Sequence, residues 1–242
     1  MILLLTGCIN PDGMAFTSLN NCKEREKQYV DAIQFYLSNT YYKIVFTENS
    51  GTDISFYFQD SIKSGRLEYL CFHGNQNKVR GKGYGECEII QYAICHSTLI
   101  NCACDKRIAK ITGRLKVKNI KTIINIHTIL FSKHTTLCAI NSDLSFPDSR
   151  FIIAHIDFYQ AFLKKKEEID DSIGYYFEHA LCDTIKTEKR FPFSPFFLMP
   201  YIEGMSGTKG EEYIEIKNTF SYTTKYARYA YSQRKKFNAE YR

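Results

Sequence analysis

The sequence predicts an α/β fold, in which a mostly parallel β-sheet carries helices on both faces and a basic helix follows at the C-terminus. The first observation behind this prediction is the hydrophobic pattern, which predicts alternating strands and helices, β-α-β-α-β-α-β, over roughly the first 114 residues. The second is the composition: 242 residues, 44% of them hydrophobic, with only 13 Gly and 5 Pro, are typical of a globular domain.

The first half of the chain supplies the regular part of this pattern. In the first predicted helix, Tyr29, Ala32, Ile33 and Tyr36 fall on one face, with Lys and Glu residues opposite. Ligands bind beyond the carboxyl ends of the strands in such sheets, so the loops after the strands are the candidate site. The predicted strands are residues 2–6, 42–47, 67–72 and 107–112, the predicted helices are 22–37, 54–62 and 86–96, and the loops are 7–13, 48–53, 73–86 and 113–119.

The second half of the chain is less regular and shows no internal repeat and no long linker. It predicts helices at 119–130, 156–166 and 172–186, strands at 135–140 and 151–154, a Phe/Pro-rich stretch at 191–200, and a helix from about residue 218. We therefore expect a single domain over residues 1–217, with halves 1–118 and 119–217, and a basic amphipathic helix over 218–242.

The cysteines and the N-terminus indicate a reducing compartment. Nine cysteines without a CxxC pair are typical of free thiols, and six histidines without an HExxH motif predict no structural metal site. The segment 5–8 (LTGC) resembles a lipoprotein cleavage box, but the apolar run before it is too short for a signal peptide. No stretch approaches the roughly 20 apolar residues of a membrane span, so we expect a cytoplasmic protein.

The segment 80–86 (RGKGYGE) is the densest motif of the chain. Three glycines at alternate positions let the backbone approach a ligand closely, Arg80 and Lys82 add positive charge, and a helix follows, which together favour a phosphate group. The spacing fits neither the Walker A box nor the dinucleotide fingerprint. We interpret the segment as a ligand loop in preference to a glycine-rich surface turn.

Two further signals leave alternatives open. Lys110 and Arg114 bracket the carboxyl end of the strand predicted at 107–112, where unpaired charge is costly. Either a bound diphosphate, which Arg holds with two N–H groups, or salt bridges to neighbouring carboxylates would neutralise them. Glu178 lies on a predicted helix rich in Tyr, Phe and Leu, and is either a buried general base with a raised pKa or a solvent-facing residue.

Together these segments resemble bacterial glycosyltransferases of the GT-A type, specifically those of capsule and lipopolysaccharide biosynthesis, whose sheet is Rossmann-like. The resemblance covers roughly residues 1–185, and GKGYGE and KITGR are its most specific parts. It rests on LLTG at 4–7, VFTENSG at 45–51, GKGYGE at 81–86, KITGR at 110–114, DSR at 148–150 and FEH at 177–179.

The resemblance implies that residues 1–118 bind a nucleotide sugar and that residues 119–217 face the acceptor. Glu178 would be the catalytic carboxylate, and Lys110 and Arg114 would stabilise the departing diphosphate. The implied nucleotide-sugar-binding residues are Thr6, Gly7, Asn10, Glu48, Asn49, Arg80, Gly81, Lys82, Gly83, Gly85, Glu86, Asp148 and Arg150.

One departure from the family pattern bears on cofactors. Most GT-A enzymes hold a divalent metal with an Asp-x-Asp motif, but this sequence has none, and KITGR stands in its place. Fixed cations can stabilise the leaving group, so we expect metal-independent transfer from a nucleotide-sugar donor to a hydroxyl of a glycan or lipid-linked saccharide acceptor. The alternatives are a nucleotidyltransferase acting on sugar phosphates and a non-enzymatic nucleic-acid-binding protein that uses its basic tail.

The net charge of +6 belongs largely to this tail. Residues 225–242 hold six Lys or Arg against a single acid, Glu240. The pattern fits either a basic helix on the inner face of the cytoplasmic membrane or a helix that packs its tyrosines on the core, and we expect no nucleic-acid partner. The face that carries the aromatic residues comprises Tyr222, Tyr226, Tyr229, Ala230, Gln233, Phe237 and Tyr241.

Overall fold

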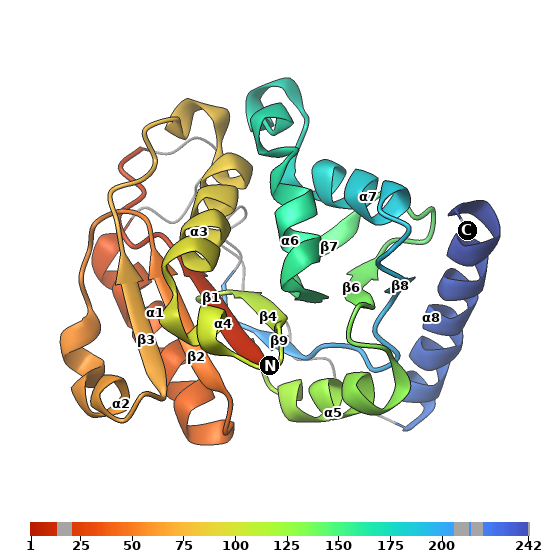
Figure 1. The fold of residues 1–242 in the computed structure, drawn as a ribbon, viewed down its shortest axis with the longest axis horizontal. Coiled ribbons are helices and arrows are strands. Elements are labelled where there is room, and N and C mark those ends of the chain that lie inside the picture. The colour runs from red at the N-terminus through yellow and green to blue at the C-terminus, as the bar shows by residue number, and fades with distance from the viewer. Residues whose placement is uncertain (14–20, 206–212, 214–219, 242) are drawn as a thin grey trace.

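A seven-stranded sheet in the order β3-β2-β1-β4-β7-β6-β8 organises the molecule (Figure 1). The computed structural model describes residues 1–13, 21–205, 213 and 220–241. Its strands are β1 (Ile2–Gly7), β2 (Lys43–Glu48), β3 (Leu67–Cys71), β4 (Arg107–Thr112), β5 (Lys116–Val117), β6 (Thr136–Ile140), β7 (Pro147–His155), β8 (Phe193–Ser194) and β9 (Ile202–Glu203). Strands β5 and β9 form a separate two-stranded sheet.

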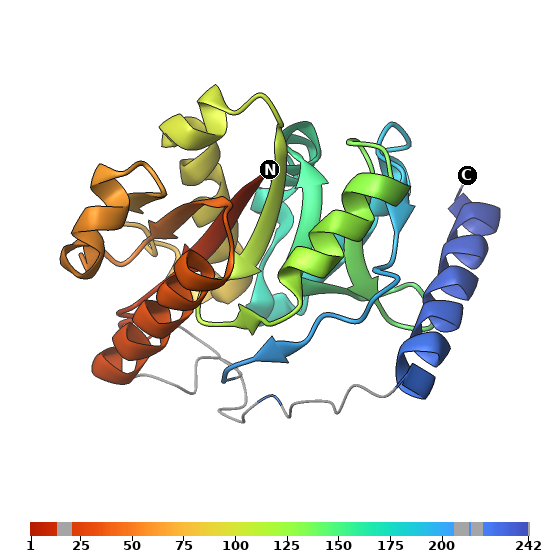
Figure 2. The same cartoon turned by 90° about the horizontal axis from the view of Figure 1, so that it is seen from below.

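The helices lie on both faces of the large sheet. Figure 2 shows α1 and α5 in front of it, whereas α3, α6 and α7 contact one another behind it. The α-helices are α1 (Cys22–Asn39), α2 (Gln59–Lys63), α3 (Lys82–His96), α4 (Thr98–Cys102), α5 (Ile120–Leu130), α6 (Ile156–Leu163), α7 (Phe177–Thr187) and α8 (Phe220–Tyr241). Short 3-10 turns occur at Ser55–Phe58, Lys78–Arg80, Lys166–Glu168 and Asp171–Ile173. The predicted α/β class is confirmed.

The sheet is mostly parallel, with one reversed strand. Strands β3, β2, β1 and β4 pair in parallel, and so do β6 and β8, whereas β7 runs antiparallel to both β4 and β6. Every residue of β1 is buried because helices cover both faces of the sheet at its centre. This arrangement brings the carboxyl ends of β1 and β4 and the start of β7 to the same edge.

The first helix shows how the sequence pattern becomes packing. Asn21 caps α1 by accepting hydrogen bonds from the backbone N–H groups of Lys23 and Glu24, at 3.1 and 3.3 Å. The apolar face predicted for this helix is the buried one. It carries Tyr36, whose hydroxyl donates to the carbonyl of Leu115 at 2.8 Å and so ties α1 to the loop after β4.

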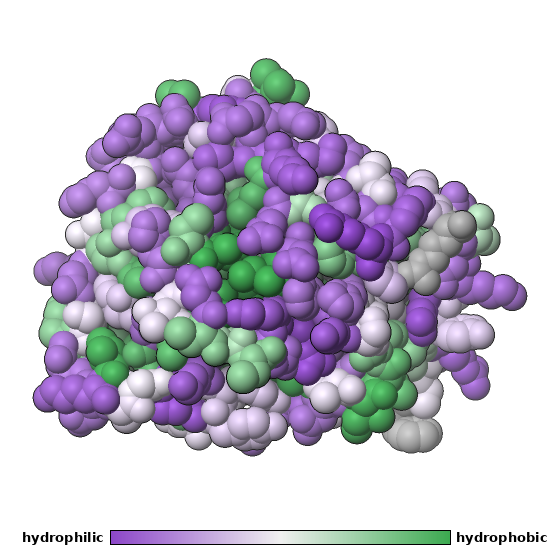
Figure 3. Space-filling view, in the orientation of Figure 1, coloured by the Kyte–Doolittle hydropathy of each residue, from purple (hydrophilic) through white to green (hydrophobic). Residues whose placement is uncertain are grey.

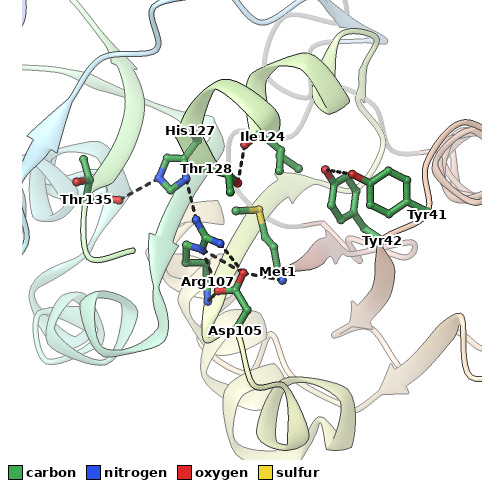
Figure 4. Close-up of polar contacts among 9 residues, drawn as sticks. All are labelled: Met1, Tyr41, Tyr42, Asp105, Arg107, Ile124, His127, Thr128 and Thr135. Atoms are coloured by element: carbon green, nitrogen blue, oxygen red, sulfur yellow. Dashed lines mark hydrogen bonds and ion pairs between the residues drawn. The ribbon is translucent and has the colours of Figure 1, made fainter. Parts of the chain in front are cut away.

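A polar cluster closes the amino-terminal edge of the sheet (Figure 4). Asp105 accepts hydrogen bonds from the Met1 amine at 3.0 Å and from the Arg107 guanidinium at 2.7 Å. The guanidinium also contacts Nδ1 of His127 at 3.5 Å, and Nε2 of His127 lies 3.4 Å from the carbonyl of Thr135. Burial lowers the pKa of His127 to about 4, so its ring is neutral at pH 7.

The C-terminal helix packs against the end of the sheet beside β8 (Figure 1). Phe237 is buried, and its ring centroid lies 4.8 Å from that of Phe193. Ala230 and Gln233 of the predicted aromatic face are also buried, whereas Tyr229 is 38% exposed. The buried part of this face fits the core-packing alternative. The side chains of Lys225, Arg228 and Lys235 are exposed.

The face of the molecule seen in Figure 1 is largely hydrophilic, with apolar side chains gathered in its middle between α3 and α6 (Figure 3). Among the described residues, no helix combines the length and apolar character needed to cross a membrane. The boundary predicted between residues 217 and 218 lies outside the described residues. The large sheet draws its strands from both predicted halves of the 1–217 domain.

Several predicted element boundaries were wrong. Helix α3 begins at Lys82, four residues before the predicted start, because the carboxylate of Asp171 accepts a hydrogen bond from the N–H of Gly83 in its first turn. The strand predicted at 151–154 extends over Pro147–His155, and α7 begins at Phe177 after a 3-10 turn. The helix predicted at 54–62 is a 3-10 turn followed by the short α2. The sequence pattern did not reveal α4, β5, β8 or β9.

Candidate active site

Two adjoining cavities open at the carboxyl ends of β1 and β4, where the sequence predicted the site. The larger cavity has a volume of about 780 Å³ and extends toward β7 and the start of α7. The smaller cavity, of about 100 Å³, lies over the loop after β1 and the first turns of α1 and α3. Both are lined by Lys82, Glu86, Thr112 and Arg114. The shared lining makes the two cavities parts of one site.

Three cations surround the smaller cavity: Arg25, Lys82 and Arg114. Arg25 is buried, and its Nε donates to the carbonyl of Cys8 at 2.9 Å. The first residue of α3, Lys82, is half-buried, and burial lowers the pKa of its amine. One carboxylate, Glu86, shares the lining. The cavity therefore carries an excess of positive charge suited to an anionic group.

Arg114 is the best candidate for a direct contact with that anion. It is 7% exposed, and its Nη1 donates to Oε1 of Gln28 at 3.1 Å and to the carbonyl of Met205 at 3.4 Å. Its buried Nε has no hydrogen-bond partner among the described residues, and none of their carboxylates pairs with it. A guanidinium that is buried without a carboxylate partner favours a bound anion, which accepts hydrogen bonds from it.

The glycines of the predicted phosphate loop have a different explanation. Asp171 occupies the N-terminus of α3, where its Oδ2 accepts a hydrogen bond from the N–H of Gly83 at 3.3 Å. A Cβ atom would lie 2.9 Å from Asp171 Oδ1 at Gly83 and 2.2 Å from Asp171 Oδ2 at Gly81. Gly81 also has a φ of 90°, which side-chain-bearing residues rarely adopt. These two glycines make room for a carboxylate of the protein itself.

Lys110 does not line either cavity, contrary to the role that the resemblance implied. Its side chain is fully buried, and its Nζ forms an ion pair with Oε1 of Glu86. The same Nζ donates to the carbonyl of Ser149 at 2.7 Å. Of the two alternatives left open for this lysine, the structure shows the salt bridge to a neighbouring carboxylate. A buried lysine requires such a partner because its charge cannot reach water.

Glu178 lies in the first turn of α7 and lines the larger cavity. Its side chain is half-buried, and the hydroxyl of Ser149 donates to its Oε1 at 2.5 Å. Burial raises the pKa of this carboxyl above its ordinary value, and the hydrogen bond from Ser149 opposes the shift. The structure therefore shows the cavity-facing carboxylate rather than the solvent-facing alternative.

Besides Gly81, three predicted binding residues lie outside the lining of both cavities. Arg80 forms an ion pair with Glu167 at 3.1 Å and stacks over Tyr84, outside both cavities. Glu48 is fully buried and accepts the N–H groups of Ile9 and Thr52 at 2.9 and 3.0 Å. Glu48 thus holds the loops after β1 and β2 together, and its oxygens are already engaged rather than free for a nucleotide sugar.

Asn10 is the third of these residues. It is exposed, and its backbone N–H donates to the hydroxyl of Ser50 at 3.0 Å. Its side-chain Oδ1 accepts the N–H of Asp12 at 3.2 Å. Asn10 lies outside the lining of both cavities. These bonds shape the loop after β1, so its role here is structural.

The remaining predicted residues divide between the two cavities. Thr6, Gly7, Asn49 and Gly85 line the smaller one, whereas Gly83, Asp148 and Arg150 line the larger one. Gly7 is required at its position because a Cβ there would lie 2.5 Å from the ring of Phe46.

Asp148 and Arg150 form an ion pair with one another in the wall of the larger cavity. The Nε of Arg150 lies 2.9 Å from Oδ1 of Asp148, and the guanidinium stacks 4.5 Å from the ring centroid of Tyr213. This pairing neutralises the two charges and presents a polar wall to the cavity. The wall is suited to hydroxyl groups of a bound molecule.

Three residues at the site escaped the sequence analysis. Arg25 lies in the first turn of α1, where the sequence pattern of an amphipathic helix places a cation on the solvent-exposed face. Asp171 stands in a turn rich in acidic residues, and its approach to Gly83 spans 88 positions of the chain. Ser149 lies inside a predicted motif, but its contact with Glu178 depends on the antiparallel course of β7.

Among the described residues, no group of three or more His, Cys, Asp or Glu side chains is arranged to hold a metal ion. Three acidic side chains of the site have partners within the protein: Glu86 pairs with Lys110, Asp148 pairs with Arg150, and Asp171 accepts a hydrogen bond at the N-terminus of α3.

No protein-family model and no curated protein matches the sequence. Among solved structures, a cytidylyltransferase from Leptospira borgpetersenii serovar Hardjo-bovis is 10% identical, with a TM-score of 0.46 over 91% of this chain and 83% of that chain. Core-mannan synthase A from Aspergillus fumigatus is 10% identical, with a TM-score of 0.42 over 96% of this chain and 84% of that chain. Mouse xyloside xylosyltransferase 1 is 10% identical, with a TM-score of 0.41 over 79% and 82%. At TM-scores below 0.5, these similarities assign no family and no activity to this chain.

Proposed function

We propose that the protein is a glycosyltransferase that moves a sugar from a nucleotide-sugar donor to a hydroxyl of a glycan or lipid-linked saccharide. One observation carries the proposal: a small cationic cavity opens directly into a larger one that holds the half-buried Glu178. The cationic part suits the donor diphosphate, and the larger part has room for two sugars. The position at the carboxyl ends of the strands is where such sheets bind ligands.

The donor diphosphate lies in the smaller cavity in this proposal. Arg25, Lys82 and Arg114 surround it, and the guanidinium of Arg114, with which no carboxylate of the described residues pairs, supplies positive charge. Charge develops on the diphosphate as the sugar leaves, and fixed cations in a partly buried site stabilise it. In this proposal these cations take the place of a metal, and Arg114 stabilises the leaving diphosphate.

Glu178 acts as the general base. It accepts the proton of the acceptor hydroxyl, whose oxygen attacks the anomeric carbon, and the bond between that carbon and the diphosphate oxygen breaks. The bonding electrons leave with the nucleoside diphosphate, and the proton stays on Glu178. A carboxylate whose pKa is raised by burial is a stronger base than an exposed one, which supports this assignment.

The biological setting follows from the sequence resemblance, which supports surface polysaccharide synthesis. The exposed Lys225, Arg228 and Lys235 of α8 support a peripheral contact with an anionic membrane surface through their charge. Binding of the protein to vesicles with and without anionic lipid tests this contact, and equal binding to both would contradict it.

A donor-hydrolysis and transfer assay tests the central proposal. UDP-, GDP- and CMP-sugars are offered with and without EDTA, and we expect release of one nucleotide that EDTA does not abolish. Sugar 1-phosphates with nucleoside triphosphates form the second arm, and oligonucleotides the third. Pyrophosphate release in the second arm alone would establish the nucleotidyltransferase instead, and salt-sensitive binding in the third arm alone would establish nucleic-acid binding.

A further inference from the structure

A chain of polar contacts links the two cavities through the protein interior. On the side of the smaller cavity, the hydroxyl of Thr6 donates to Oε1 of Glu86 at 3.0 Å. Glu86 pairs with Nζ of Lys110, and this nitrogen also donates to the carbonyl of Ser149 at 2.7 Å. On the side of the larger cavity, the hydroxyl of Ser149 donates to Glu178 at 2.5 Å.

Lys110 lies in the middle of this series of polar contacts but lines neither cavity. Its side chain is 0% exposed, and its ammonium lies 5.4 Å from the ring centroid of Phe177, the residue before Glu178. Strand β4 places it beside β7, where Lys110 pairs in register with Ile152. A fully buried ammonium with two strong acceptors has little freedom to move, so it holds α3, β7 and the start of α7 in fixed relation.

We propose that Lys110 is a positioning residue of the transfer reaction, which holds Glu86 and Ser149 in place and thereby fixes the orientation and the charge of Glu178. This inference rests on the proposed function, because it describes how the base of that reaction is prepared. It replaces the role in leaving-group stabilisation that the sequence resemblance implied for Lys110.

Besides burial, which raises the pKa of Glu178 most, charged and hydrogen-bonding groups from three elements act on it. Glu86 of α3 raises its pKa, Lys110 of β4 lowers it, and the hydroxyl of Ser149 on β7 lowers it through the hydrogen bond. Lys82, also on α3, faces Glu178 as well. Glu86 and Lys110 therefore act on Glu178 in opposite directions, and loss of Lys110 alone leaves the repulsion by Glu86 uncompensated.

Carbon-13 NMR titration of the glutamate carboxyl groups tests the proposal without substrate. The Glu178 signal is assigned by its absence in Glu178→Gln. In Lys110→Met, we expect its titration midpoint to move to higher pH by about 0.5 or more. In Lys110→Met combined with Glu86→Gln, both opposing charges are absent, and we expect the midpoint to return toward that of the unmodified protein.

Two further variants provide a second measurement and a control. Ser149→Ala leaves the ion pair intact and removes only the hydroxyl, so it is measured even where Lys110→Met does not fold, and it also moves the midpoint upward. Lys165→Met removes another Lys–Glu pair, to Glu168 at 3.9 Å, and leaves the midpoint unchanged. An unchanged Glu178 midpoint in a folded Lys110→Met protein would overturn the proposal; where that variant does not fold, an unchanged midpoint in Ser149→Ala would do so.

The titration separates this inference from the proposed function. A shifted midpoint in a protein that turns over no nucleotide sugar would retain the coupling of Lys110 to Glu178 and reject the glycosyltransferase. In an active enzyme, the acidic limb of kcat/KM moves to higher pH in Lys110→Met and Ser149→Ala by the same amount as the NMR midpoint, while the KM for donor stays constant. A purely structural role would lower the rate at every pH without moving that limb.

Discussion

The ammonium of Lys110 and the carboxylate of Glu86 form an ion pair between β4 and α3 at the junction of the two cavities. Lys110 is fully buried, whereas 21% of the Glu86 side chain is exposed. Removal of one partner from a buried pair leaves the other charge uncompensated, which costs more than removal of both. The pair therefore contributes to the stability of the fold as well as to the arrangement of the site.

The stability of this pair is tested by two variants. We expect Lys110→Met to lower the free energy of unfolding by about 3–5 kcal/mol, and Lys110→Met with Glu86→Leu to recover most of that loss. Urea denaturation followed by circular dichroism measures both. A double variant as unstable as the single one would show that the ammonium stabilises the fold through contacts other than Glu86.

Substitution of Glu178 tests the general base. We expect Glu178→Gln to lower kcat by about 10²–10⁴-fold, because the amide cannot accept the hydroxyl proton, while donor affinity stays constant. Glu188→Gln, at the other end of α7, provides the matched control because Glu188 lies outside the lining of both cavities. Equal activity of the two variants would assign the base to another residue.

Donor affinity distinguishes Arg114 from Arg80. We expect Arg114→Ala to weaken nucleoside diphosphate binding by about 10–100-fold, since a charge-assisted hydrogen bond contributes about 1.5–3 kcal/mol. Arg80→Ala should leave the affinity nearly unchanged, because Arg80 pairs with Glu167 outside the cavities. Isothermal titration calorimetry with UDP and GDP measures both constants, and the reverse order of effects would restore the phosphate-loop interpretation of residues 80–86.

The fit of Gly83 against Asp171 predicts coupled effects on stability. A Cβ at position 83 would lie 2.9 Å from Asp171 Oδ1, so we expect Gly83→Ala to destabilise the protein by about 1–3 kcal/mol. In the background of Asp171→Ala, the same change should cost about 1 kcal/mol less, because the crowded oxygen is gone. A double-mutant cycle by urea denaturation measures the coupling, and strictly additive costs would contradict the contact.

The lowered pKa of His127 predicts that the protein loses stability in mild acid. Its pKa in the folded protein, about 4, lies below its ordinary value of 6.5, so the unfolded chain binds the proton more readily. The free energy of unfolding therefore falls as the pH drops from about 6.5 to about 4, by roughly 3 kcal/mol in all. Urea denaturation across this range should give a flatter profile for His127→Gln and an unchanged slope for His73→Gln, a variant of an exposed histidine. Identical slopes in all three proteins would refute the assignment.

Much of the fold is predictable from local pattern. Local hydrophobic periodicity predicts an element when the element depends on neighbouring residues. This holds for the apolar run at the start of the chain, the amphipathic face of α1 and the short β-branched strands. The position of the site at the carboxyl ends of the strands also follows, because it is a property of the fold class. Boundaries were less well predicted, since the start of α3 at Lys82 depends on a carboxylate from a distant turn.

The sequence by itself determined the α/β class, the edge of the sheet where the site lies, and the presence there of Glu178, Lys82 and Arg114. Only the tertiary structure decided which charges are free. Lys110 and Arg114 are alike in the sequence, four residues apart at the end of one strand, yet Lys110 is neutralised by Glu86 and Arg114 is left without a carboxylate among the described residues. The physical reason is that the partner of a buried charge comes from a distant element, and only the packing of α3 and β7 against β4 determines which element that is.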